Sequence, residues 1–161
     1  MASTTLTETQ FRSELGDFSS IVCFKALISG LEEALGEKAA YISVVAAGRL
    51  RGKTLVTELG LAGQKPDLAA AAIAMNQALG KEGTRLCIVD KIEAFDDGYR
   101  VYCRETVCSA GEPQGASTTL SFTLGAIQGA LETMMEKRLR GTQVESVLRG
   151  SQHDIVELNF R

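Results

Sequence analysis

Apolar residues recur every three to four positions through the first half of the chain, which predicts helices with one apolar face. Starting from Ser20, these residues are Phe24, Leu27, Ile28, Leu31 and Leu35. Gly36 follows the last of them, and glycine is a common residue at a helix end. The same spacing predicts a second helix over residues 39–59 and a third over 66–80.

The pattern changes near residue 85, where β-branched and aromatic residues become frequent. Residues 86–95 and 99–108 read as two strands, and the Asp-Asp-Gly between them is a hairpin turn signal. The remaining expected elements are a loop over 109–118, a helix over 120–138 and strands over 142–149 and 154–160. Three helices, a hairpin, a helix and a second hairpin predict an α+β domain with helices set against one antiparallel sheet.

The length and charge of the chain favour a single soluble domain. Its 161 residues fit one domain, which we expect over 20–161 after a partly flexible N-terminal arm over 1–19. The net charge is −3, and the basic residues are scattered rather than gathered on one face. The densest group is Lys137, Arg138 and Arg140, which we expect at a helix C-terminus, where positive charge is favoured. We therefore expect no nucleic-acid partner.

No apolar run approaches the roughly 18 residues that a membrane span needs, and the N-terminus lacks the pattern of a secretory signal. These features predict a cytoplasmic protein without a membrane span. The four cysteines form no C-x-x-C pair and accompany one histidine, which is a poor set for zinc or disulfides. We expect Cys23, Cys87 and Cys103 to be small buried residues, and Cys108, beside the loop, to be the best candidate for a reactive thiol.

Catalytic motifs are hard to find in this sequence. His153 falls in a predicted turn and reads as a solvated residue rather than a ligand or base. The acidic pairs at 32–33 and 96–97 are consecutive, so neither forms a facing carboxylate dyad. The loop before the last helix lacks the lysine and the spacing of a phosphate loop. An enzyme that acts through its own side chains is therefore the less favoured class, and no cofactor is expected.

Two glycine pairs interrupt the predicted helices, although each glycine in a helix interior costs about 1 kcal/mol relative to alanine. Gly48 and Gly52 lie within the apolar stripe of their helix, which predicts a close approach of another backbone or of a ligand. Gly125 and Gly129 lie roughly 100–140° from the stripe of their own helix. We expect these two to make a second close contact, with a neighbouring helix or with a dimer mate.

Three segments in order carry a family resemblance: AAGRLRGKTL (46–55), LSFTLGAIQGALETMM (120–135) and VESVLRGSQHDIVELNF (144–160). They resemble the A-G-R-x-x-G helix, the C-x-x-x-x-G-x-x-x-G helix and the closing segment of the 4-vinyl reductase, or hydrocarbon-binding, domain family. The resemblance implies helices packed on a four-stranded antiparallel sheet, a distant relation to TRAPP vesicle-tethering subunits, and homodimers formed through helices.

The same resemblance implies an apolar pocket for a small hydrophobic molecule such as a tetrapyrrole, an isoprenoid or an aromatic compound. The positions that match the family's metal ligands are Leu120, Glu145, Leu148 and Val156. Three of these side chains are aliphatic and cannot hold zinc, so the resemblance is to a metal-free member.

These inferences favour a non-catalytic carrier or sensor of a small hydrophobic molecule. The candidate ligand contacts, each of which is also typical of a core, are Phe24, Tyr99, Val101, Tyr102, Phe122, Met134 and Met135. The alternative is a protein-interaction or assembly module with a filled core, in the biogenesis of photosynthetic complexes. A vinyl-reducing enzyme ranks third, because the chain has no nucleotide-binding fingerprint.

Overall fold

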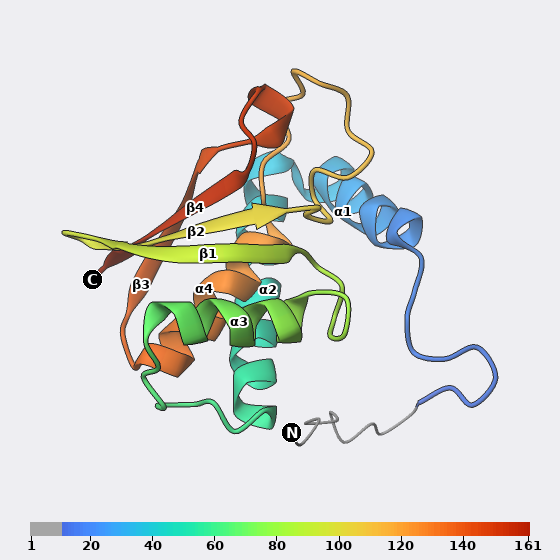
Figure 1. The fold of residues 1–161 in the computed structure, drawn as a ribbon. Coiled ribbons are helices and arrows are strands. Elements are labelled where there is room, and N and C mark those ends of the chain that lie inside the picture. The colour runs from blue at the N-terminus through green and yellow to red at the C-terminus, as the bar shows by residue number, and fades with distance from the viewer. Residues whose placement is uncertain (1–10) are drawn as a thin grey trace.

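The computed structural model of the chain describes residues 11–161 and confirms the α+β class. Its elements in chain order are α1 (Ile21–Leu35), α2 (Glu37–Glu58), α3 (Leu68–Leu79), β1 (Ile88–Phe95), β2 (Gly98–Arg104), α4 (Phe122–Met135), β3 (Leu139–Glu145), the 3-10 turn η1 (Val147–Arg149) and β4 (Asp154–Phe160) (Figure 1). The first ten residues of the expected arm lie outside the described residues, so its division from the domain stays a prediction.

The four strands form one antiparallel sheet in the order β1-β2-β4-β3. The second hairpin joins the first through β4, which pairs with β2 on one side and β3 on the other. One face of this sheet is covered by helices: α3 packs against β1, α4 packs against β3, and α2 packs on α4 (Figure 1). The apolar core lies between the sheet and these helices.

The last helix ends earlier than the sequence pattern predicts. It stops at Met135, because Glu136 adopts a left-handed backbone with φ 51°. The expectation that Lys137, Arg138 and Arg140 stabilise a helix C-terminus is therefore wrong, since all three follow the helix. β3 begins at Leu139, three residues before the predicted strand.

The second expected strand is shorter than predicted as well. β2 ends at Arg104, because Glu105 is left-handed with φ 49°, and the chain then turns toward α4. Cys108 lies in this turn rather than on the strand, and both Cys108 and Cys103 are buried. The stretch predicted as strand over 147–149 is the turn η1, where Ser146 accepts a hydrogen bond from the Leu148 amide.

Both glycine pairs belong to one interface, between α2 and α4. A Cβ at Gly48 or Gly52 would lie 2.1 Å from a backbone oxygen of α4, at Phe122 or Ala126 respectively. A Cβ at Gly125 or Gly129 would likewise lie 2.1 Å from a backbone oxygen of α2. We expected the two glycine pairs to make separate contacts, but both pairs lie in the same α2–α4 contact, one pair on each helix. The physical reason is that α4 is buried around nearly its whole circumference, so the flank beside its apolar stripe also meets protein.

Helix α1 differs from the prediction most. None of its residues is buried, and Leu27 of its apolar stripe is 61% exposed. Phe24 is half-buried and meets the Phe122 ring edge-on at 5.3 Å between centroids. Cys23 is exposed, so its expected burial is wrong. The apolar stripe of α1 rests on the surface of the domain rather than in the core.

Candidate functional site

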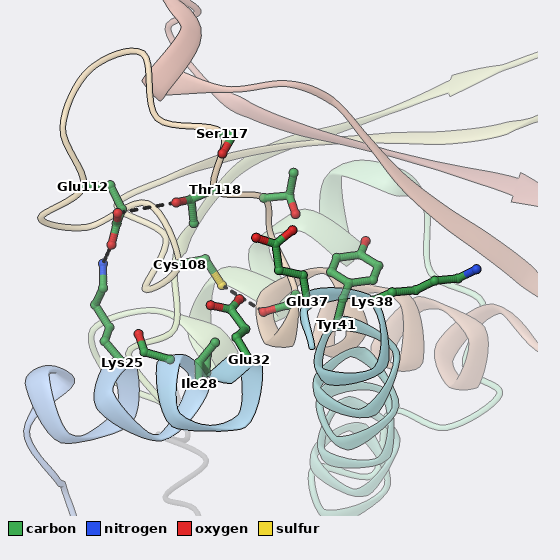
Figure 2. Close-up of a pocket in the computed structure, with 13 residues that line it drawn as sticks. Lys25, Ile28, Glu32, Glu37, Lys38, Tyr41, Cys108, Glu112, Ser117 and Thr118 are labelled. Carbon is green, nitrogen blue, oxygen red and sulfur yellow. Dashed lines mark hydrogen bonds and ion pairs between the residues drawn. The ribbon is translucent and has the colours of Figure 1, made fainter. Parts of the chain in front are cut away.

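A cavity of about 550 Å³ lies between α1, the first two turns of α2 and the segment 105–121 that joins β2 to α4. Figure 2 shows Glu32 on α1 and Glu37 and Tyr41 on α2, whose side chains rise from the helices toward this connecting segment. The connecting segment supplies the opposite wall and runs beside α1 (Figure 1). The site is thus built where the peripheral helix meets the longest loop of the fold.

Lys25 fastens the loop to α1 at one side of the cavity. Its ammonium group donates to the Ala110 carbonyl oxygen at 2.5 Å and to the carboxylate of Glu112. The hydrogen bond from Lys25 lowers the pKa of Glu112, so this carboxylate is ionised at neutral pH. Thr118 also donates to the Glu112 carboxylate at 3.4 Å (Figure 2). Lys25 therefore holds the first part of the loop near α1, and Glu112 links this part to Thr118 at the other end of the loop.

The inner end of the cavity is formed by a buried thiol and hydroxyl groups. The Cys108 sulfur lies 3.5 Å from the Thr123 hydroxyl and 4.0 Å from the Ser121 hydroxyl, close to the start of α4. The thiol is 6% exposed and has no histidine or carboxylate among its hydrogen-bond partners in residues 11–161. This arrangement is one of packing and hydrogen bonding rather than of an activated nucleophile.

Tyr41 supplies the most versatile group of the wall. Burial raises the pKa of its phenol, and the nearby Cys108 thiol raises it further. The hydroxyl is therefore protonated at neutral pH and can donate as well as accept a hydrogen bond. No group in residues 11–161 bonds to this hydroxyl, whereas the ring offers an apolar surface to the cavity. A bound molecule with a polar atom can pair with it.

The seven residues predicted to contact a ligand are all described, and none of them lines this cavity. Val101, Met134 and Met135 are buried in the core, and Tyr102 lies on the uncovered face of the sheet, where it donates to Glu93. The structure does not bring these positions together, and their role as ligand contacts stays a prediction. Phe122 and its partner Phe24 come nearest to the cavity, because Phe122 directly follows the lining residue Ser121.

Sequence reasoning missed the residues of the cavity wall, most clearly Tyr41, Lys25 and Glu112. At 100° per residue Tyr41 falls on the same face of its helix as Gly48 and Gly52, and sequence spacing alone cannot tell a partly exposed tyrosine there from a core residue. Only one signal pointed to this place: the glycine-, serine- and threonine-rich loop beside Cys108. Loops of this kind carry binding groups more often than regular elements do.

The four positions that match the family's metal ligands do not fit a zinc ion in this chain. Leu120, Leu148 and Val156 are buried aliphatic side chains, and Glu145 is exposed and accepts a hydrogen bond from Ser151. No group of three or more metal-ligating side chains occurs within residues 11–161. The buried carboxylate of Asp154, close to these positions in the sequence, accepts several hydrogen bonds.

Asp154 ties the β3–β4 connection to the segment after β2. One carboxylate oxygen accepts from the Thr106 hydroxyl at 2.7 Å and from the Ser109 hydroxyl at 2.9 Å. The other accepts from the Val147 amide at 3.1 Å and from the Gln143 amide group at 3.3 Å. These bonds fix the end of the loop from which the cavity is built.

His153 lies at the outer side of the sheet, away from the cavity. Its Nε2 is 2.9 Å from a carboxylate oxygen of Asp90, and Arg104 bonds to the same carboxylate. The hydrogen bond from Arg104 is the largest influence on Asp90 and lowers its pKa. His153 thus belongs to a hydrogen-bonded cluster with Asp90 and Arg104 and does not line the cavity.

Comparison with known proteins finds similarity in structure but no match in sequence. No family model matches the sequence, and no curated protein is similar to it in sequence. No helix in residues 11–161 is long and apolar enough to cross a membrane.

Solved structures of three other proteins are similar to the chain. The phenol-responsive sensory domain of the transcription activator PoxR with phenol matches with a TM-score of 0.54 at 14% identity, over 90% of this chain and 77% of that chain. A trafficking protein particle complex subunit 3 from Naegleria fowleri, covalently bound to palmitic acid, matches with a TM-score of 0.57 at 14% identity, over 88% and 92%. A vinyl-4-reductase family protein from Methanocaldococcus jannaschii matches with a TM-score of 0.55 at 15% identity, over 90% and 83%. The chain therefore shares one fold with a sensory domain, a trafficking subunit and a vinyl-4-reductase family protein.

Proposed function

We propose that the chain is a non-catalytic binding domain that holds one small molecule in the cavity between α1, α2 and the segment 105–121. The observation that carries the proposal is the cavity, whose volume of about 550 Å³ lies within the usual range for small-molecule sites. Two proteins of the same fold, one with phenol and one covalently bound to palmitic acid, add support. The domain would act as a carrier or a sensor.

The wall of the cavity narrows the class of ligand. It combines the Tyr41 ring and Ile28 with carboxylates at Glu32 and Glu37 and with hydroxyl groups of the loop. A long hydrocarbon chain or a tetrapyrrole would desolvate these carboxylates without pairing them, which is unfavourable. A small aromatic molecule that carries a hydroxyl or amino group satisfies both parts of the wall. We therefore favour this class over an isoprenoid or a tetrapyrrole.

The proposal is tested by titrating the protein with phenol as the probe, followed by calorimetry and by amide chemical shifts. We expect saturable binding, with the largest shifts at Tyr41 and in the loop 109–118. Ser29→Trp places a large side chain in the cavity from the exposed face of α1, and it should abolish the binding.

The matched control is Ala26→Trp, an equally exposed position on the same helix that does not line the cavity. This variant should bind phenol as the unmodified chain does. Mass spectrometry of the organic extract of the purified protein extends the search to ligands acquired in the cell. The proposal is contradicted if the unmodified chain binds neither phenol nor any extractable small molecule. It is also contradicted if Ser29→Trp binds phenol as tightly as Ala26→Trp does.

A second candidate function is an assembly module, and it is favoured by apolar side chains that α1 and α2 leave exposed. Leu27 on α1 is 61% exposed and Ile42 on α2 is 59% exposed, and each stands among other exposed apolar residues of its helix. Such surfaces commonly mark protein interfaces. We propose that a second copy of the chain covers them and forms a homodimer.

Light scattering during size-exclusion chromatography measures the mass of the particle. We expect a dimer for the unmodified chain and a monomer for the double variant Leu27→Glu/Ile42→Glu. Val144→Glu, at an exposed apolar position on β3, is the control and should remain dimeric. If the unmodified chain is monomeric at all concentrations, the homodimer proposal is wrong, whereas the small-molecule proposal is unaffected.

A further inference from the structure

A second cleft lies at the opposite end of the α2–α4 pair, and its wall is dominated by cations. The basic residues around it are Arg49, Lys53, Lys137, Arg138 and Arg161. Two acidic residues, Glu132 and Glu136, also line it. The side chains of the wall therefore carry an excess of three positive charges on a chain whose net charge is −3. Among the described residues, one ion pair joins two side chains of the wall, that of Arg49 with Glu132. The other four basic side chains have no acidic partner within the wall.

Both carboxylates of the wall are already occupied. Glu132 is 7% exposed, and its two oxygens accept from Arg49 at 2.7 and 3.0 Å and from the Leu139 amide at 3.0 Å. Glu136 forms an ion pair with Lys65, which stands outside the cleft wall, at 2.6 Å. Neither carboxylate is left to neutralise the other cations of the cleft.

Three of the last four carbonyl groups of α4 already accept hydrogen bonds. Its last carbonyl groups would normally disfavour an anion nearby. Here the carbonyl oxygen of Thr133 accepts from the Gly63 amide at 3.0 Å, and that of Met134 accepts from the Lys65 amide at 3.1 Å. The segment between α2 and α3 thus caps the helix and removes these carbonyls from competition.

The remaining donors belong to side chains that line the cleft. Arg49 uses its Nε and one Nη to hold Glu132, which leaves three further N–H groups on a guanidinium whose orientation is fixed. Lys53 and Arg138 form no ion pair with any of residues 11–161. A rigid guanidinium flanked by free ammonium and guanidinium groups matches the oxygens of a phosphate-bearing anion.

We propose that this cleft binds a phosphate-bearing anion, either a free one or the headgroup of a lipid. The site is distinct from the cavity at the N-terminal end of α2, so it stands or falls independently of the proposed small-molecule function. It uses Lys53 and Arg138 as the unpaired cations and Arg49, oriented by Glu132, as the fixed donor.

Calorimetry with inorganic pyrophosphate at low salt tests the proposal on the full chain. We expect saturable binding at one site that weakens as salt is added. The double variant Lys53→Gln/Arg138→Gln changes two exposed or half-exposed side chains and should weaken binding by about tenfold or more. Lys81→Gln/Lys91→Gln removes the same charge at exposed positions outside both the cleft and the cavity, and it should bind as the unmodified chain does.

Vesicle sedimentation distinguishes a lipid headgroup from a free phosphate compound as the bound anion. Phosphatidylcholine vesicles that contain phosphatidic acid are compared with pure phosphatidylcholine vesicles. Binding to the acidic vesicles that is lost in the Lys53→Gln/Arg138→Gln variant assigns the site to a lipid headgroup, whereas binding of pyrophosphate alone assigns it to a free phosphate compound. The proposal is overturned if neither probe binds, or if the control variant loses as much affinity as the double variant.

Discussion

At the scale of single residues, the carbonyl oxygens of Phe122 and Ala126 lie where side chains of Gly48 and Gly52 would begin. Real Cβ atoms do not approach a backbone oxygen to 2.1 Å, so any side chain here forces the two helices apart. The propensity lost by placing glycine in a helix is offset by the close backbone contact that it permits.

Alanine substitutions measure this contact directly. Gly52→Ala and Gly129→Ala should each lower the free energy of unfolding by about 3 kcal/mol, the upper part of the usual range for overpacking. Gly30→Ala on α1 is the control, because a Cβ at this position would meet nothing within 4 Å. This substitution should raise the free energy of unfolding by about 0.5–1 kcal/mol, because alanine is the better helix former. Urea denaturation provides the values. Equal effects at all three positions would refute the interpretation.

Glu132 gives a pH-dependent prediction at the same scale. Burial raises the pKa of this carboxyl, but hydrogen bonds from Arg49, the Leu139 amide and Gln128 outweigh it, so the folded pKa lies below the usual value. A lowered folded pKa stabilises the fold above the unfolded pKa of about 4.3, and this contribution is lost as the pH falls through the folded pKa.

We therefore expect Glu132→Gln to be less stable than the unmodified chain at pH 7, and the difference to shrink as the pH falls from about 4.3 toward 3. Urea midpoints measured between pH 3 and pH 7 provide the check. A difference that stays constant over this range would show that the carboxylate charge is not what stabilises the contact.

At the scale of elements, the loop after β2 is held to α1 mainly through Lys25 and Glu112. Lys25→Met removes the ion pair and the bond to the Ala110 carbonyl. A partly buried pair of this kind contributes about 1 kcal/mol, so amide exchange in residues 109–118 should quicken about fivefold.

Hydrogen exchange followed by mass spectrometry measures the effect on the loop. Lys38→Met removes a lysine of the same cavity wall that forms no ion pair with any of residues 11–161, and it should leave exchange in the loop unchanged. If both variants exchange alike, the loop is held by its other contacts.

The element boundaries show what sequence patterns can predict here. The three N-terminal helices and the first hairpin were foreseen because their apolar spacing and turn signals are local. The end of α4 was not foreseen, because the left-handed backbone of Glu136 and the capping of Thr133 by Gly63 depend on a segment distant in sequence. The cavity wall was missed for the same reason, since Lys25 and Glu112 meet only after folding.

At the scale of the whole molecule, burial is distributed unevenly. Twelve of the fourteen residues of α4 are buried, whereas α1 has no buried residue. The cavity that we propose as a small-molecule site lies at the weakly packed end of the fold, between α1 and the loop. The proposed binding site is thus built from the parts of the fold that are most easily displaced.

Native-state hydrogen exchange should report this order. We expect amides of α1 to exchange through local opening and those of α4 only through global unfolding. Added phenol should slow exchange in α1, and it should also slow exchange in α4, because a ligand that binds only the folded state makes global unfolding rarer. Slow exchange of α1 in the absence of any ligand or partner would contradict the expected order.

The reciprocal glycine contact also limits how this sequence can vary. When two side chains collide in a core, one can be exchanged for a smaller one and the other can grow. Here each glycine faces a backbone carbonyl oxygen, and every amino acid carries this group, so no substitution on the opposite helix can make room for a side chain. Positions 48, 52, 125 and 129 therefore have no compensating change on the opposite helix, and we expect them to stay glycine in homologues whose cavity walls and surface charges have diverged freely.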